Sequence, residues 1–260
     1  MSDKLEIKYP YFVLDRILKI ETLEELRDFP RDMLSILSED LSDGVISGLT
    51  PTVEEKYITF SKGIVKYQGD IYLISPDPVV AFEATENEVI IKMEFLDIEE
   101  THDYRSRGML LKIDANITLE ENEIEIGRFK LKQGAELRSD YVDLEDFITE
   151  YNTINIVHVK YAGYKVSTLS HLVLKYFAAQ ALETRTTDVM DINFCMLCLN
   201  SGRIEKSVIQ NYIAYKLEEE IKDYTNSELH RKLVTILDKI KRENSGLKRK
   251  AAVGRKVIID

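Results

Sequence analysis

The spacing of apolar and polar residues changes twice along the chain, and each change predicts a different kind of structure. Before residue 44 the spacing is helical, and Thr22-Leu-Glu-Glu25 has the form of a capping box. Pro30 suits the first turn of a second short helix, from Arg31 to about Leu41. The apolar residues of that helix share one stripe: Met33, Leu34, Leu37 and Leu41. Residues 1–43 are therefore expected to form an N-terminal helical segment, ended by Gly44 and Gly48.

From about Val45 the spacing becomes that of β-strands. The stretches 57–60 and 63–67 are β-rich, and Gln68-Gly69-Asp70 predicts a tight turn into a partner strand at 71–74. Residues 88–96 alternate, with Val89, Ile91, Met93 and Phe95 on one face and Lys92 and Glu94 on the other. Further strands are predicted at 123–131 and 155–161, with a short acidic helix or turn at 141–151. Residues 44–163 are thus expected to form an antiparallel β-rich module.

After Gly163 the spacing is helical again. One helix is predicted from the core-facing pattern of Leu169, Leu172, Val173, Tyr176 and Phe177, and others at 188–199 and 205–222. Thr225-Asn-Ser-Glu228 is a second capping box, and the helix after it has Leu229, Leu233, Ile236 and Ile240 in one stripe. Residues 164–245 are therefore expected to form a helical bundle, which makes the fold class α+β.

The composition indicates in which compartment the protein folds and which classes of partner it disfavours. The chain has 260 residues, 44% hydrophobic and 31% charged, with a net charge of −11, as in soluble globular proteins. The acidity disfavours nucleic-acid binding, which needs clustered Lys and Arg. Only two cysteines are present, so no disulfide framework is expected. The sequence shows neither a signal peptide nor a membrane segment, and we expect folding in the cytoplasm.

Common catalytic motifs are missing from the sequence. It contains no phosphate-binding loop, no dinucleotide fingerprint, no nucleophile elbow and no zinc-protease motif. Cys195-Met-Leu-Cys198 has the spacing of a metal or redox pair but lies in an apolar run without a second ligand pair, which favours buried cysteines. The scattered histidines, His102, His158, His171 and His230, are expected to be structural or at the surface. We therefore predict no catalytic residue, no cofactor and no metal.

One acidic cluster keeps an enzymatic alternative open. Asp97, Glu99, Glu100 and Asp103 follow a predicted strand and could hold Mg²⁺ as in a nuclease. Asp77 with Lys92 imitates part of a restriction-type nuclease core, but Ile90 stands where that core needs a carboxylate. Because charges of both signs surround the cluster, a solvated loop is favoured.

The C-terminal segment has the most distinctive charge. Between Lys239 and Lys256 there are eight basic residues and one acidic residue, a net +7 that leaves −18 for the rest of the chain. Residues 246–260 are either a flexible solvated tail or an arm that docks on an acidic surface of another copy or a neighbouring protein. The candidate docking residues are Arg242, Lys248, Arg249, Lys250, Arg255 and Lys256.

Two stretches resemble a known family. Gly44-Val-Ile-Ser-Gly-Leu49 with the glycine-punctuated segment 57–74 resembles a β-module in baseplate and tail-fibre proteins of contractile-tailed phages and phage-tail-like particles, the bacteriocins. The strand Ile124-Glu-Ile-Gly-Arg-Phe-Lys-Leu131 is similar to a later strand of such proteins. The sequence lacks a repetitive shaft, which favours a compact baseplate or fibre-attachment protein.

The resemblance implies a structural role without catalysis. It implies several copies around a baseplate ring, in contact with other tail or baseplate proteins and with copies of the chain itself. The protein would be cytoplasmic during assembly and then part of a virion or tail-like particle. The alternatives are a metal-dependent enzyme acting on nucleic acid and a cytoplasmic adaptor that binds partners through its helical bundle.

Overall fold

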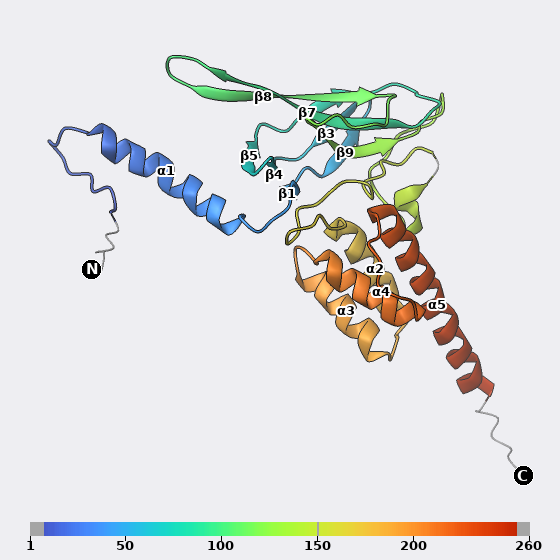
Figure 1. The fold of residues 1–260 in the computed structure, drawn as a ribbon. Coiled ribbons are helices and arrows are strands. Elements are labelled where there is room, and N and C mark those ends of the chain that lie inside the picture. The colour runs from blue at the N-terminus through green and yellow to red at the C-terminus, as the bar shows by residue number, and fades with distance from the viewer. Residues whose placement is uncertain (1–7, 150, 254–260) are drawn as a thin grey trace, which may run out of the picture.

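A β-rich module and a helical bundle pack against each other; the N-terminal helix projects from them on one side, and the C-terminal helix extends past them on the other (Figure 1). The computed structural model describes residues 8–149 and 151–253, and only the backbone of residues 245–253. The antiparallel strands of the β-rich module and the helices of the C-terminal half confirm the α+β fold class.

Three small antiparallel sheets make up the β-rich module. The first has the order β1-β4-β5, the second β2-β3-β6 and the third β8-β7-β9. Their strands are β1 (Gly44–Gly48), β2 (Pro51–Glu54), β3 (Tyr57–Phe60), β4 (Gly63–Tyr67), β5 (Asp70–Ile74), β6 (Val79–Ala81), β7 (Val89–Glu100), β8 (Arg105–Asp114) and β9 (Glu123–Phe129). The predicted hairpin is present: β4 and β5 pair antiparallel, and Gln68 and Gly69 make the turn with positive φ angles.

The helices of the C-terminal half begin close to their predicted residues. They are α2 (His171–Glu183), α3 (Val189–Asn200), α4 (Lys206–Leu217) and α5 (Asn226–Val253). Ser170 and Asp188 cap α2 and α3 by accepting from the N–H groups of Leu172 and Met190. The capping box before α5 also forms, because Glu228 accepts from the Thr225 N–H and Thr225 Oγ1 accepts from the Glu228 N–H. Helix α5 continues through residues 246–253, beyond the predicted end of the bundle at 245.

The N-terminal prediction was wrong in detail. A single helix, α1 (Ile20–Leu37), replaces the two predicted short helices, with Pro30 in its interior. Lys19 is its N-cap and no side chain caps it, so the capping box at Thr22 does not form. The helix ends at Leu37, before the two glycines.

The predicted strand at 155–161 was also wrong. Only isolated β-bridges form here: Asn155 pairs with Arg128, and Tyr161 pairs with Val45 and with Thr168. Asn155 Oδ1 accepts from the Val157 N–H at 2.9 Å, which turns the chain locally. Between the two predicted strands, a 3₁₀ helix (Glu145–Ile148) stands where a short acidic helix or turn was expected.

The module and the bundle share one hydrophobic core. A continuous cluster of buried side chains runs from the strands to α2, α3, α4 and α5. Polar contacts join the same parts: His230 Nε2 donates to the Leu144 carbonyl at 2.7 Å, and Asn226 Nδ2 donates to the Val159 carbonyl at 2.9 Å. These two regions therefore form one packed unit, from which α1 stands apart.

Candidate functional site

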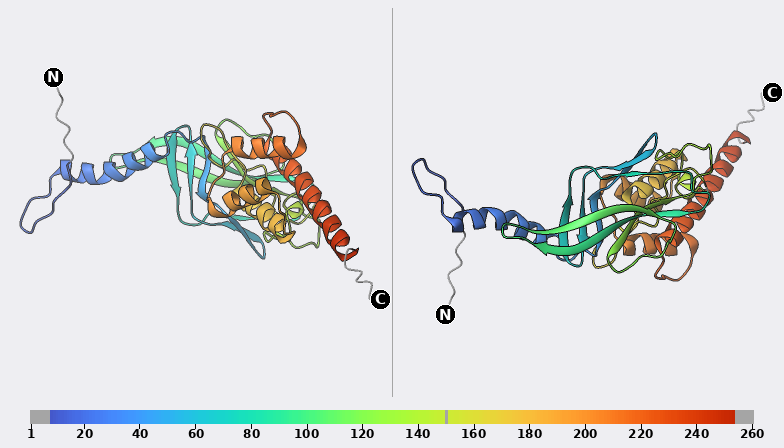
Figure 2. Two further views of the ribbon diagram at one scale, coloured as in Figure 1. Left: turned by 90° about the horizontal axis from the view of Figure 1, so that it is seen from below. Right: turned by 90° about the horizontal axis from the view of Figure 1, so that it is seen from above.

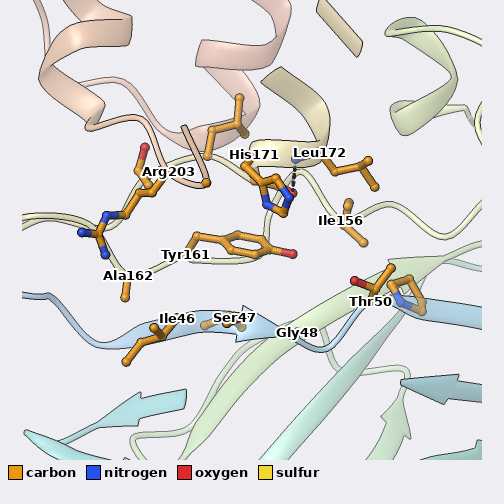
Figure 3. Close-up of a pocket in the computed structure, with 16 residues that line it drawn as sticks. Ile46, Ser47, Gly48, Thr50, Ile156, Tyr161, Ala162, His171, Leu172 and Arg203 are labelled. Atoms are coloured by element: carbon orange, nitrogen blue, oxygen red, sulfur yellow. Dashed lines mark hydrogen bonds between the residues drawn. The ribbon is translucent and has the colours of Figure 1, made fainter. Parts of the chain in front are cut away.

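The pocket between β1 and the start of α2 is lined mainly by groups that already have structural roles (Figure 3). It measures about 380 Å³ and is lined by residues that include Ser47, Tyr161, Ser170, His171 and Arg203. Ser170 Oγ caps α2, and Arg203 pairs with Glu205 at 3.2 Å. Burial lowers the pKa of His171 and raises that of Tyr161, so both are neutral near pH 7. No paired nucleophile and base emerge among these described lining residues.

His158, His230 and both cysteines behave as structural residues, and His102 is exposed. Burial lowers the pKa of His158 and of His230, and His230 Nε2 donates to the Leu144 carbonyl at 2.7 Å. Cys195 and Cys198 are free and buried, and burial raises the pKa of each thiol to about 12. Neither thiol is therefore a reactive thiolate near neutral pH.

Three of the four acidic residues of the predicted cluster lie within a strand and not after it, whereas Asp103 lies in the turn that follows. Strand β7 continues to Glu100, so Asp97, Glu99 and Glu100 are exposed residues of its outer half. Within residues 8–149 and 151–253, no group of three or more His, Cys, Asp or Glu side chains is placed to hold a metal ion. Asp77 and Lys92, the pair that imitates a nuclease core, have different partners in the structure. Asp77 accepts from the Lys62 N–H, and Lys92 pairs with Asp114 and Glu123.

Two buried charged clusters were not predicted from the sequence. Lys92 is 1% exposed, although the alternation placed it on the polar face of its strand, and its Nζ lies 3.1 Å from both Asp114 and Glu123. In the bundle, Lys216 pairs with Asp191 at 2.9 Å, and Asp191 also accepts from the Tyr212 hydroxyl at 2.8 Å. Each buried charge has an opposite charge beside it, as a charge inside a protein requires.

The largest unexplained feature is the N-terminal arm, which we define as residues 8–37. Fifteen large apolar residues of this arm are exposed, and α1 buries none of its residues. They are Tyr9, Tyr11, Phe12, Val13, Leu14, Ile17, Leu18, Ile20, Leu23, Leu26, Phe29, Met33, Leu34, Ile36 and Leu37. Isolated exposed apolar residues are ordinary, but a contiguous patch of this kind marks an interaction surface.

The arm projects away from the rest of the protein. Figures 1 and 2 show α1 leaving the β-rich module and α5 ending at the opposite side of the molecule. Only the last turns of α1 approach the module, where Arg31, Leu34 and Ser35 line a groove with Gly69 and Tyr72 of the β4–β5 hairpin. With 3.6 residues per turn, Leu26 lies on about the opposite side of the helix from Ser35. The apolar stripe therefore faces away from the body.

A buried lysine fixes the point where the arm leaves the body. Lys66 of β4 is 7% exposed, and its Nζ donates to the carbonyls of Ser38, Glu39 and Leu41 at 2.8, 3.0 and 2.7 Å. These carbonyls follow the C-terminal end of α1, where a cation is favoured by the helix dipole. The clasp orients α1 without burying its apolar stripe.

A second exposed apolar surface lies on α3. Most residues of this helix are apolar: Phe194, Cys195 and Cys198 face the core, while the outer face exposes Val189, Met190, Met196, Leu197 and Leu199 beside Asn193 and Asn200. Exposed apolar residues grouped on one face of a helix are typical of a contact surface.

The predicted docking residues of the C-terminal segment are only partly described. Arg242 is exposed on α5, and Lys248, Arg249 and Lys250 belong to the helical backbone of α5. Arg255 and Lys256 lie outside the described residues. The exposure of the arm was not predicted, although the apolar run from Tyr9 to Leu18 and the amphipathic stripe after it are visible in the sequence. In the parts that the structure describes, no helix is long and apolar enough to cross a bilayer.

Comparison with known proteins gives only distant matches. No family model matches the chain, and no curated protein matches its sequence. Among solved structures, a chain of the type VI secretion TssK–TssF–TssG baseplate subcomplex matches with 9% identity and a TM-score of 0.41, covering 91% of this chain and all of that one. A crystal structure of TssK matches with 9% identity and a TM-score of 0.40, over 90% of this chain and 68% of that one. A chain of a type VI secretion baseplate complex matches with 11% identity and a TM-score of 0.38, over 91% of this chain and all of that one. At these TM-scores the matches do not establish a shared fold.

Proposed function

We propose that this protein is a structural component of a contractile phage tail or tail-like particle, in the baseplate or at the attachment of a fibre, and that it acts by protein–protein assembly. The observation that carries the proposal is the N-terminal arm. In an isolated chain an apolar surface of this extent stays exposed to water. In an assembly it is a contact surface, because a neighbouring protein covers it.

The residues of the sequence resemblance support the same proposal. They form β1, the β3–β4–β5 region and β9, and so make up a large part of the three sheets. Gly48 and Gly63 face each other across β1 and β4, and a side chain at either position would meet backbone atoms closer than 3.0 Å. The glycines of the resembling stretch thus allow a close backbone approach.

Mass spectrometry of purified contractile particles from the native host tests this function. The expected result is that the protein is present in baseplates, whether of the phage-tail or the type VI secretion type, in a fixed ratio to its neighbours. Its absence from every such particle would contradict the proposal.

We further propose that the basic segment 246–260 provides a second contact, with an acidic surface of a neighbour. Reversing the charge of Lys248, Arg249 and Lys250 together to Glu should then reduce incorporation into particles at least severalfold. The matched control makes the same change of charge at exposed lysines elsewhere: Lys56, Lys62 and Lys222. Equal incorporation of both variants would show that the segment makes no such contact.

The exposed outer face of α3 favours a second candidate function, an adaptor that binds partners through its helical bundle. This face exposes Met196 and Leu197 beside a well-packed core. An adaptor would be absent from particles and would lose its partner on Met196→Glu. A particle component would instead be found in baseplates, and this difference separates the two candidates.

A further inference from the structure

Helix α1 has the residue spacing of a helix that packs along other helices. Its exposed apolar stripe advances by three, four, three and four residues, which is the repeat of a coiled-coil seam. The positions are Leu23, Leu26, Pro30, Met33 and Leu37. Two further apolar residues, Phe29 and Ile36, precede seam positions, and Leu34 follows one, so the apolar face is wider than the seam itself.

The charges of α1 leave this seam free for an identical helix. Glu21, Glu24 and Asp28 lie on the opposite side of the helix, and Asp28 is already paired with Arg27 at 2.6 Å and Arg31 at 3.2 Å. The residues that flank the seam are Thr22, Arg27, Phe29, Leu34 and Ile36. In a parallel pair of identical helices these flanks bring Thr22 beside Arg27 and Phe29 beside Leu34, so no like charges meet.

The exposed apolar area is also close to that of a standard stable interface. Eight large apolar residues of α1 remain between 36% and 73% exposed: Ile20, Leu23, Leu26, Phe29, Met33, Leu34, Ile36 and Leu37. Together they expose on the order of 700 Å², given the size of large apolar side chains. A standard stable interface takes about 800 Å² from each partner, and the largest apolar patch of a typical monomer is about 300–600 Å².

From the seam spacing, the placement of the charges and the exposed area, we propose that α1 helices of identical chains pack in parallel along their Leu23–Leu37 stripes and hold the protein as a homo-oligomer. This inference rests on the proposed function as an assembly protein and names the partner of its arm. The Lys66 clasp presents every arm at the same angle to its body, as a rotationally symmetric assembly requires.

Cysteine cross-linking tests the parallel register. Leu26→Cys and Met33→Cys place one thiol on the seam, where identical residues face each other, and Glu24→Cys places it on the charged side as the matched control. The native thiols do not interfere, because both are buried and have pKa values raised to about 12 by that burial. Under mild oxidation of the purified full chain at micromolar concentration, the two seam variants are expected to give covalent dimers on a denaturing gel and the control to give none.

Two results would overturn the inference: no cross-link in either seam variant, or equal cross-linking of Glu24→Cys. The first result would mean that the arm binds a different protein. The cross-linking result and the proposed function can fail separately. A protein that is found in particles but does not cross-link would contradict only the contact between identical α1 helices. A protein that cross-links but is absent from particles would contradict only the baseplate role.

Discussion

At the scale of single residues, buried lysines join parts of the chain that hydrophobic packing alone would leave loosely connected. Lys66 ties the end of α1 to the β-rich module, and Lys92 holds Asp114 and Glu123 within the third sheet. Neither role follows from the sequence, where both lysines alternate with apolar residues as surface lysines do. Their burial depends on which carbonyls and carboxylates the fold brings near, and spacing along one strand carries no information on that.

Replacing Lys66 should loosen the arm without unfolding the body. Lys66→Met removes the Nζ donor from the Ser38, Glu39 and Leu41 carbonyls. The Ser38 carbonyl keeps the Leu41 N–H at 3.0 Å, and each buried carbonyl left without a partner costs about 1 kcal/mol or more. We expect proteolytic cleavage between residues 38 and 43 to become several times faster, while the core helices stay protected. Lys62→Met, an exposed lysine close to β4, is the control and should leave the cleavage rate unchanged. Equal rates for all three proteins would contradict the role of the clasp.

Glu123 gives the stability of the protein a defined pH dependence. Burial alone would raise the pKa of this carboxyl, but hydrogen bonds from Lys112, the Glu120 N–H and Lys92 outweigh it and lower the pKa from 4.5 to about 2. A carboxyl whose pKa is lower in the folded state stabilises the fold fully above its unfolded pKa. This contribution is lost as the pH falls from about 4.5 to about 2.

Glu123→Gln should therefore reduce the free energy of unfolding at pH 7 by about 3 kcal/mol, because it removes one partner of a buried ion pair. Urea denaturation at pH 7 and at pH 2.5 measures this, and the difference between the variant and the natural protein should shrink at the lower pH. Glu121→Gln, an exposed residue of the same turn, is the charge-matched control and should stay within about 0.5 kcal/mol. A difference that is independent of pH would contradict the assignment.

At the scale of elements, helices were predicted better than strands. The bundle helices carry their own signals, because the stripe Leu229, Leu233, Ile236 and Ile240 and the cap before it are local in sequence. Strand β8 was missed because its outer half is charged and exposed, and its extended form comes from pairing with β7. The reverse error occurred at 155–161, where buried apolar residues alternate but the chain turns at Asn155 and runs between the module and the bundle.

The two capping boxes offer a direct comparison of one motif in two settings. Thr225→Ala removes a hydroxyl that accepts from the Glu228 N–H at the start of α5, and should lower the free energy of unfolding by about 1 kcal/mol. Thr22→Ala changes the same motif inside α1, where no side-chain cap forms, and should have no such effect. Chemical denaturation of both variants measures the difference, and equal losses would show that the cap at Thr225 contributes nothing.

At the scale of the whole molecule, apolar side chains are buried in some parts of the protein and exposed in others. The β-rich module and the bundle share one closed core, whereas the arm keeps fifteen large apolar residues exposed and α3 keeps an apolar outer face. The division into helical segment, β-module and bundle stays a prediction, whereas the expected burial of both cysteines is confirmed. The sequence could not show that the first helix would lie outside the core, because an amphipathic stripe is the same whether its partner is in the chain or in a neighbour.

The most direct test is the mass of the purified full chain in solution, measured by light scattering during size-exclusion chromatography. The natural protein should have a mass that is a multiple of 30.1 kDa. The double variant Leu26→Glu, Met33→Glu should be a monomer with unchanged circular dichroism, since α1 contributes no buried residue to the core. A natural protein that stays at 30.1 kDa across the micromolar range would contradict assembly through α1.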